Sequence, residues 1–319
     1  MSAAAAGTAS LSRPQTKYFN ADFNFNELSS AEDDYKERVS TLLSGEIGEA
    51  RLIRATLAAD RAASRWNVFY TKNGANAYKP RHFIVEAFQS LRSARIVVDI
   101  GCGAGANVWP VIEKTNVTHV FGTDVAPAAL DALAAHPDAS AALESGKLTL
   151  FLWDFSRNSP PLPLFRQRPN SSSDTSAAAV AAAAASMWHV DTPPIKGTAA
   201  DSVLLTFTAS AIHPRDHAEL VRGAVALLAP GGRLLFRDHG ARDLAQLRAV
   251  DDSILLPSMN ERGDGTLAYF FTLAEVDTLM RNAGLVIEEL SHACVTNFNR
   301  KTGTEMKRVF VHAVGRKPE

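Results

Sequence analysis

Asp99-Ile-Gly-Cys-Gly-Ala-Gly105 is the stretch of sequence that points most directly to a fold. It follows Arg95-Ile-Val-Val-Asp-Ile100, a run rich in β-branched residues, and precedes a segment of helical character at 108–114. A β-branched run that stops at a glycine cluster is typical of a buried parallel strand. Glycines there let the backbone turn sharply and approach a ligand that a β-carbon would hold off. The stretch therefore predicts a strand, a ligand-binding turn and a helix.

The chain on the C-terminal side of this turn continues the same alternation. Short apolar runs predict further strands at 119–123, 148–152, 202–207, 233–236, 285–290 and 308–314. Helical spacing predicts one helix that opens at Pro127 and two more at 216–228 and 273–283. Such alternation implies right-handed βαβ units and a mostly parallel sheet covered on both faces, so we predict one α/β domain over residues 95–319.

Three other regions differ from that domain in pattern. Residues 1–26 have no clear period and are expected to be flexible. Residues 27–94 predict a helical extension with a break near Gly45 and Gly48, followed by a connector at 66–88 that contains turn signals. Residues 157–200 are rich in proline, serine and alanine and predict a low-complexity surface insertion.

Composition bounds the class of protein. The 319 residues are 46% hydrophobic and 21% charged, which is ordinary for a globular chain and excludes wholesale disorder. No apolar stretch is long enough for a membrane span, and the N-terminus lacks the apolar core of a signal peptide. Cys102 and Cys294 fit a reducing compartment and cannot form a four-ligand zinc site. We expect a cytoplasmic protein with no metal and no membrane partner, and a nuclear or mitochondrial location stays open.

The net charge of −1 hides an uneven distribution of charge along the chain. Between Arg51 and Arg95 nine basic residues stand against two acidic ones, with aromatic residues among them. Contact with RNA phosphates combined with stacking on bases would need such a strip. A solvated helix face explains the same charges equally well.

The glycine turn and two acidic residues restrict which ligand the turn can bind. Gly101, Gly103 and Ala106 satisfy the G-x-G-x-x-G/A dinucleotide fingerprint. Asp124 ends the second strand and can accept both hydroxyls of an adenosine ribose, which NAD and S-adenosylmethionine (SAM) both carry. Asp154 ends the third strand, where a SAM enzyme binds the adenine amino group and a dinucleotide domain has no set need for an acid. We therefore favour SAM over NAD.

The C-terminal part and several longer motifs resemble known families. Two final strands in place of a second domain resemble the Rossmann-like, seven-stranded sheet of the class I SAM-dependent methyltransferases. More particular motifs, in matching order over about 65–315, resemble the eukaryotic tRNA N3-methylcytidine methyltransferases. These motifs are Arg65-Trp-Asn-Val-Phe-Tyr70, Lys79-Pro-Arg-His-Phe83, Asp99–Gly105, Thr123-Asp-Val-Ala-Pro127, Trp153-Asp-Phe155, Ser210-Ala-Ile-His-Pro214, Pro230–Gly240, Arg262-Gly-Asp-Gly-Thr266, Tyr269-Phe-Phe-Thr272, Asn299-Arg-Lys and Arg308-Val-Phe310.

The resemblance implies roles for individual residues. It implies that Trp66 and Tyr70, the aromatic pair of the extension, fold over bound SAM. The residues that match the family's cofactor contacts along the strand ends are Gly101, Gly103, Asp124, Asp154, Phe155 and Thr206. Relatives carry an aliphatic residue at Thr206, usually an acid at Pro80 and commonly a tyrosine at His239. The last two departures lie in segments expected to face RNA.

The chemistry of N3 methylation sets modest demands on the protein. Cytosine N3 has a free lone pair at neutral pH, so alignment with the methyl carbon matters more than a strong base. Our candidates for catalytic residues are Asp238 and Arg237, which would orient the base or balance its charge, and His213 near the entry of the base. An ion pair that fixes a loop and a structural histidine are the alternatives.

The resemblance also implies the substrate and a partner. The target nucleotide of such enzymes lies in the tRNA anticodon loop, and relatives that act on serine tRNAs can need seryl-tRNA synthetase. Basic residues expected on the RNA face are Arg81, His82, Arg262, Arg300, Lys301, Lys307 and Arg308. Alternatives are a class I methyltransferase acting on another RNA, a protein or a small molecule, an NAD-dependent oxidoreductase, and a catalytically silent RNA-binding module.

Overall fold

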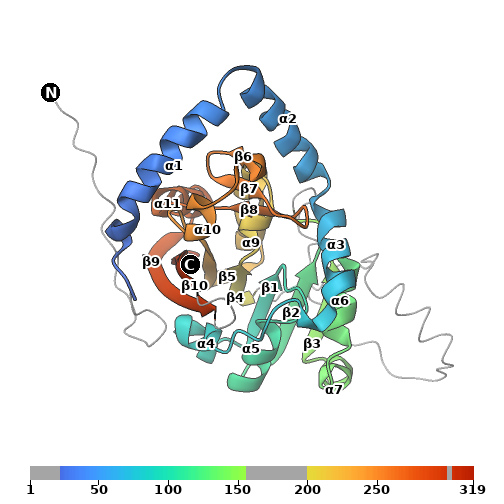
Figure 1. Cartoon of the computed structure of the whole chain (residues 1–319). Helices are drawn as coiled ribbons and strands as arrows, with labels where there is room; N and C mark the ends of the chain where they lie inside the picture. The colour runs from blue at the N-terminus through green and yellow to red at the C-terminus, as the bar shows by residue number, and fades with distance from the viewer. Residues whose placement is uncertain (1–21, 156–199, 300–303) are drawn as a thin grey trace.

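A computed structural model describes residues 22–155, 200–299 and 304–319 of the chain (Figure 1). Its main sheet has seven strands in the spatial order β3-β2-β1-β4-β5-β10-β9. In that order the strands are β3 (Leu148–Leu152), β2 (His119–Asp124), β1 (Ile96–Ile100), β4 (Ala200–Thr206), β5 (Leu228–His239), β10 (Thr304–Arg316) and β9 (Val286–Asn299). The first five are parallel, whereas β10 runs antiparallel to both β5 and β9. The predicted seven-stranded sheet is confirmed.

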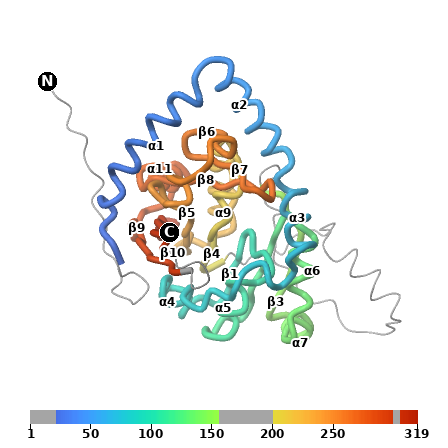
Figure 2. Tube along the Cα trace, viewed as in Figure 1, coloured from blue at the N-terminus to red at the C-terminus, as the bar shows by residue number. Residues whose placement is uncertain are grey.

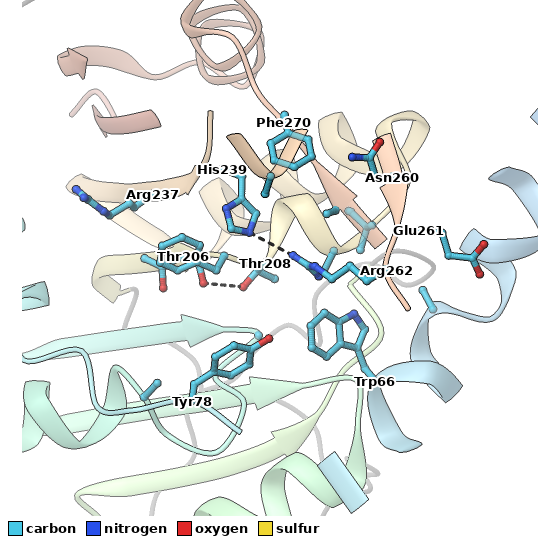
Figure 3. A pocket seen from close by; sticks show the side chains of 18 of the residues that line it. Trp66, Tyr78, Thr206, Thr208, Arg237, His239, Asn260, Glu261, Arg262 and Phe270 are labelled. Atoms are coloured by element: carbon cyan, nitrogen blue, oxygen red, sulfur yellow. Dashed lines mark hydrogen bonds between the residues drawn. The ribbon is translucent and has the colours of Figure 1, made fainter. Parts of the chain in front are cut away.

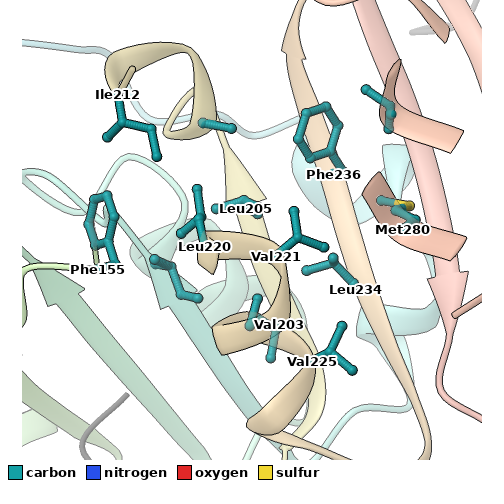
Figure 4. Close-up of a cluster of buried hydrophobic side chains, with 14 of the residues drawn as sticks. Phe155, Val203, Leu205, Ile212, Leu220, Val221, Val225, Leu234, Phe236 and Met280 are labelled. Carbon is teal, nitrogen blue, oxygen red and sulfur yellow. The ribbon is translucent and has the colours of Figure 1, made fainter. Parts of the chain in front are cut away.

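Helices cover both faces of this sheet. Successive apolar side chains along a strand point to opposite faces, so each face needs a layer of helices to bury it. In β4, Val203 and Leu205 join one core and Leu204 joins the other. The first core packs under α9 (His217–Ala226) and α11 (Leu273–Asn282) (Figure 4). Helices on the opposite face are α4 (Ile84–Ala87), α5 (Val108–Lys114), α6 (Pro127–Ala134) and α7 (Ala139–Glu144). The prediction of a sheet buried on both sides is correct.

The N-terminal extension traces an arch around the sheet domain (Figure 2). It consists of α1 (Ser29–Leu42), α2 (Gly45–Asp60) and α3 (Ala62–Asn73). The chain turns between α1 and α2 at Gly45, whose φ of 57° is costly for any residue with a β-carbon. Gly48 lies inside α2 and does not break it.

Two expectations for this part of the chain are wrong. The segment from Trp66 to Asn73 was expected to be a connector, but it forms most of α3, because helix ends only at Gly74 with a φ of 51°. The start of the chain was expected to be flexible through residue 26. Phe23 is instead buried against β9 and β10, and Asp22 donates its backbone N–H to the carbonyl of Cys294 at 3.0 Å. Residues 1–21, the rest of the segment expected to be flexible, and nearly all of the predicted insertion at 157–200 lie outside the described residues.

A second, three-stranded sheet lies between α2 and the main sheet and was not predicted. Its strands are β6 (Ile254–Leu256), β7 (Met259–Glu261) and β8 (Leu267–Tyr269). Arg54 of α2 holds it through an ion pair with Glu261 at 2.6 Å, and Arg51 donates to the carbonyl of Asp251 at 2.7 Å. A short helix, α10 (Leu244–Leu247), joins β5 to this sheet. Extension and sheet domain therefore share one packed interior.

Candidate active site

A cavity of about 1220 Å³ opens beyond the carboxyl ends of the parallel strands (Figure 3). Open α/β sheets place ligands at this edge, where the strand order reverses. Here the order reverses between β1 and β4, and residues following both strands line the cavity. Its walls come from the glycine turn, from α3, from the ends of β2 to β5, from the small sheet and from β10.

The glycine turn forms one end of the cavity. Gly101 and Gly103 have φ values of 70° and 55°, which residues with a β-carbon rarely adopt. A β-carbon on Gly101 would lie 2.4 Å from the Thr208 hydroxyl, and one on Gly103 would lie 2.3 Å from the Tyr70 hydroxyl. Glycine is therefore required at both positions by backbone conformation and by the close approach of two neighbours.

Asp124 ties this turn to the end of β2. Its carboxylate accepts the backbone N–H of Gly103 at 2.9 Å and that of Ala126 at 2.9 Å. Burial raises the pKa of Asp124 to about 6, while the backbone hydrogen bonds oppose the rise. Asp154 and Phe155, which follow β3, also line the cavity. Both acids predicted to contact a cofactor therefore line it.

Trp66 and Tyr70 lie on one side of α3 and line the cavity over the glycine turn. Their ring centroids are 6.0 Å apart, and Phe69 meets both rings edge-on. Asn67 anchors the helix by accepting the backbone N–H of Ala128, at the start of α6, at 3.0 Å. Burial raises the pKa of Tyr70 well above its ordinary value, so this phenol stays neutral.

A buried polar network that the sequence did not reveal lies beneath the cavity. Asn107 donates to both carboxylate oxygens of Asp99, at 3.1 and 3.2 Å, and to the Thr206 hydroxyl at 2.6 Å. It accepts from Arg81 at 3.3 Å. Burial raises the pKa of Asp99 to about 7, against the effect of the Asn107 hydrogen bond. This network fixes Thr206, a predicted cofactor contact, through its side-chain hydroxyl.

The predicted catalytic residues do not all reach the cavity. Side chains alternate along β5, so Arg237 and His239 line the cavity while Asp238 between them does not. Asp238 is fully buried, and its carboxylate accepts the backbone N–H of Ser210 at 3.0 Å and that of His239 at 2.8 Å. Burial raises its pKa to about 6. Asp238 is thereby placed to position the strand end, and His239, which was noted only as a departure from the family, lines the cavity.

His213 also lies apart from the cavity lining. Its Nδ1 accepts the backbone N–H of Arg215 at 3.1 Å, and it caps a single turn of 3-10 helix at Pro214–Asp216. Burial and the charge of Arg215 lower its pKa. The structure places this histidine as a cap after β4.

The residues predicted to face RNA fall into three groups. Arg81, Arg262 and Arg308 line the cavity itself. His82 is exposed outside it, and Lys307 forms an ion pair with Glu27 at 2.6 Å. Two further predicted residues, Arg300 and Lys301, lie outside the described residues.

Three phenylalanines that had no predicted role line the cavity near His239. Phe207, Phe270 and Phe310 line it around His239. Phe207 has a φ of 57°, a strained value for a residue with a β-carbon. Phe270 and Phe310 stand in the motifs Tyr269-Phe-Phe and Arg308-Val-Phe310, which contributed to the family resemblance but were given no role of their own.

The described residues offer no cluster for a metal ion and no membrane-spanning helix. In the ranges 22–155, 200–299 and 304–319, His, Cys, Asp and Glu side chains nowhere gather in a group of three or more that could hold a metal ion. None of the helices in these ranges has the length and apolar character to cross a membrane.

The sheet order and the position of the cavity define a class I methyltransferase. The chain belongs to the family described as a methyltransferase domain, whose model matches residues 72–290. This membership confirms the predicted methyltransferase fold and enzyme class. It excludes the alternative of an NAD-dependent oxidoreductase.

Similar curated proteins narrow the resemblance within that class. A tRNA N(3)-cytidine methyltransferase of Rattus norvegicus, METTL6, is 29% identical over 81% of this chain and 80% of its own length. The tRNA N(3)-methylcytidine methyltransferase trm140 of Schizosaccharomyces pombe is 28% identical over 78% of this chain and 72% of its own length. A solved SAM-dependent methyltransferase of Anabaena variabilis shares the fold, with a TM-score of 0.50 and 15% identity over 80% of this chain and 94% of its own.

Proposed function

We propose that this protein is a SAM-dependent methyltransferase that forms N3-methylcytidine in the anticodon loop of tRNA. The similarity to tRNA N3-cytidine methyltransferases over about four-fifths of the chain carries this proposal. The continuity of the cavity supports it, because one space joins the glycine turn to an end lined by arginine and aromatic side chains. A small substrate would need no such end.

The residues around the glycine turn fit the adenosyl part of SAM. Gly101 and Gly103 give the turn its positive φ values and let Thr208 and Tyr70 pack against its backbone, and Asp124 and Asp154 offer carboxylate acceptors at adjoining strand ends. Trp66 and Tyr70 provide apolar cover above them. When bound, SAM supplies a methyl group as an electrophilic carbon on a sulfonium.

The protein's own task is to align the cytosine ring and exclude water from it. Phe207, Phe270 and Phe310 offer ring faces on which an unstacked base can pack. Arg237 lines the cavity over the rings of Phe83 and Phe310, at 5.2 and 5.4 Å from their centroids. From there it can orient the base carbonyl, with Asp238 positioning the strand that carries it.

The test is to incubate the purified protein with methyl-labelled SAM and total tRNA, digest the RNA and identify the labelled nucleoside. We expect N3-methylcytidine. Label found as 5-methylcytidine, or only on protein, would contradict the proposal. We also propose a cytoplasmic location and seryl-tRNA synthetase as the presenting partner, so addition of that synthetase should raise the rate on serine tRNAs and leave other tRNAs unchanged.

A further inference from the structure

Two arginines contact His239 in the cavity, and a third, Arg81, lies over the neighbouring Phe207 ring. Nη2 of Arg262 lies 3.2 Å from Nε2 of His239, and Nη2 of Arg308 lies 3.4 Å from Nδ1. A dashed line marks the contact between Arg262 and His239 in Figure 3. The Arg81 guanidinium lies 4.7 Å from the centre of the Phe207 ring, which packs 5.5 Å from the imidazole. The three guanidinium groups therefore converge on one aromatic-walled space.

Of these three arginines, only Arg308 forms an ion pair with a carboxylate of the described residues. Arg308 is matched by Asp243, whose two oxygens lie 3.0 and 2.8 Å from Nε. Arg262 donates to the carbonyl of Leu267 at 2.8 Å, and Arg81 donates to Asn107. Neither of these two forms an ion pair with a carboxylate in the part of the chain that the structure describes.

The other acids near this space have partners elsewhere, although Asp99 and Asp238 still act on Arg81 through their charge. Glu261 lines the cavity but is paired with Arg54 at 2.6 Å. Asp238 accepts two backbone N–H groups. Burial and the charges of Arg262, Arg308 and Arg81 lower the pKa of His239 well below its ordinary value, so the imidazole is neutral.

The lining is therefore rich in hydrogen-bond donors and ring faces. A guanidinium can donate two parallel hydrogen bonds to the oxygens of a phosphate. Aromatic rings stack on any base, whatever its identity. A nucleoside would occupy only the rings. A nucleotide would use the rings and the guanidinium groups together, because its phosphate would accept hydrogen bonds from the guanidinium groups.

We propose that Arg262 and Arg308, supported by Arg81, form a phosphate subsite that holds a phosphate of the target nucleotide. The unit that the enzyme recognises is then a nucleotide and not a nucleoside. This inference rests on the proposed function only in taking the target to be a cytidine of RNA.

The test compares the affinities of cytidine 5′-monophosphate and cytidine by calorimetry, with no methyl transfer involved. Because a hydrogen bond to a charged group contributes about 1.5–3 kcal/mol, we expect the monophosphate to bind at least about tenfold more tightly. Arg262→Gln should remove most of that difference and leave cytidine unchanged. Arg222→Gln, on the exposed face of α9, is the matched control and should bind both like the wild type. Inorganic phosphate should compete with the monophosphate and not with cytidine.

Arg308 needs a milder change, because its loss would leave the buried Asp243 carboxylate without a cation. Arg308→Lys keeps the charge but not the fork, and its thermal unfolding should be checked beside its affinity. The proposal is overturned if the two ligands bind equally, or if Arg262→Gln weakens both to the same degree. Either result can occur while tRNA is still methylated at N3. Conversely, a preference for the monophosphate with no labelled tRNA would contradict the proposed function alone.

Discussion

At the scale of single residues, Asp124 connects the glycine turn to the start of α6. Its carboxylate accepts hydrogen bonds from Gly103 and Ala126 and faces the cavity. Asp124→Ala removes the carboxylate that would accept the ribose hydroxyls. It also removes the hydrogen bond from Gly103 that fixes the backbone of the glycine turn. Two hydrogen bonds to a charged group are worth about 3 kcal/mol or more, so SAM affinity should fall at least about 100-fold in calorimetry, with unfolding still cooperative. Asp138→Ala, at an exposed acid, is the control. Retained affinity would show that this carboxylate does not hold the cofactor.

Gly103 tests whether the turn and the aromatic cover act together. In Gly103→Ala the new methyl group would meet the Tyr70 hydroxyl at 2.3 Å, in a backbone conformation that itself costs about 1–2 kcal/mol. Gly146→Ala is a matched control, because Gly146 has a φ of 70° and no atom near its missing β-carbon. We expect both variants to lose stability in chemical denaturation but only Gly103→Ala to lose SAM binding. Tyr70→Phe in the Gly103→Ala background should restore part of it. Equal SAM affinities in the two glycine variants would contradict this.

At the scale of elements, α3 carries two kinds of side chain that can be separated. Trp66 lines the cavity, whereas Val68 on the same helix is 61% exposed. Trp66→Ala removes apolar cover from the bound cofactor, so SAM affinity should fall about tenfold while the unfolding temperature changes little. Val68→Ala should change neither quantity. A loss of stability as large in Trp66→Ala as in a core variant would mean that the tryptophan serves packing.

The elements that sequence predicts well here are those whose pattern is local. The buried strands are continuous β-branched and aliphatic runs, and β3 and α5 have the predicted bounds. The small sheet was missed because each of its three strands has only three residues and is held by Arg51 and Arg54 from a distant helix. Helix α3 was missed because turn signals at Asn73-Gly74 and Pro80 suggested irregular structure, although they follow the helix.

The same distinction applies to the candidate site. Gly101, Asp124 and Asp154 could be found because strand ends in a parallel sheet meet at one edge. Asp238 and Arg237 were both candidates for orienting the base, yet alternation along β5 implies that only one of these two neighbours can face the cavity. Nothing local indicates that Asn107 would join Asp99, Thr206 and Arg81, because those contacts span up to 99 positions.

At the scale of the whole molecule, the cavity is one space built from segments far apart in the chain. The extension supplies Trp66 and Tyr70, the sheet supplies its strand ends, and the C-terminal hairpin supplies Arg308 and Phe310. Arg242 and Glu32, paired at 2.7 Å, join the loop after β5 to α1. Cofactor and substrate ends are therefore held by one continuous interior.

That interior holds buried titratable groups whose protonation changes the stability of the folded chain in opposite directions. Burial lowers the pKa of His217 and of His292 to about 4 and raises that of Asp238 to about 6. A histidine with a folded-state pKa below its unfolded value of about 6.5 favours the folded chain above pH 6.5, and that stability is lost as pH falls towards 4. A carboxyl with a raised folded-state pKa acts in reverse, because the folded chain binds its proton first. Acidification from pH 7 to 5 therefore brings two opposed contributions.

Two variants separate these contributions in denaturation measured at pH 7 and pH 5. His217→Gln removes one histidine contribution, so its free energy of unfolding should fall by about 2 kcal/mol less than that of the wild type over this interval. Asp238→Asn removes a compensating carboxyl, so its free energy should fall by about 1 kcal/mol more. The same pH dependence in both variants and the wild type would mean that His217 and Asp238 titrate alike in the folded and unfolded chain, and the interior would then be open to water at both positions.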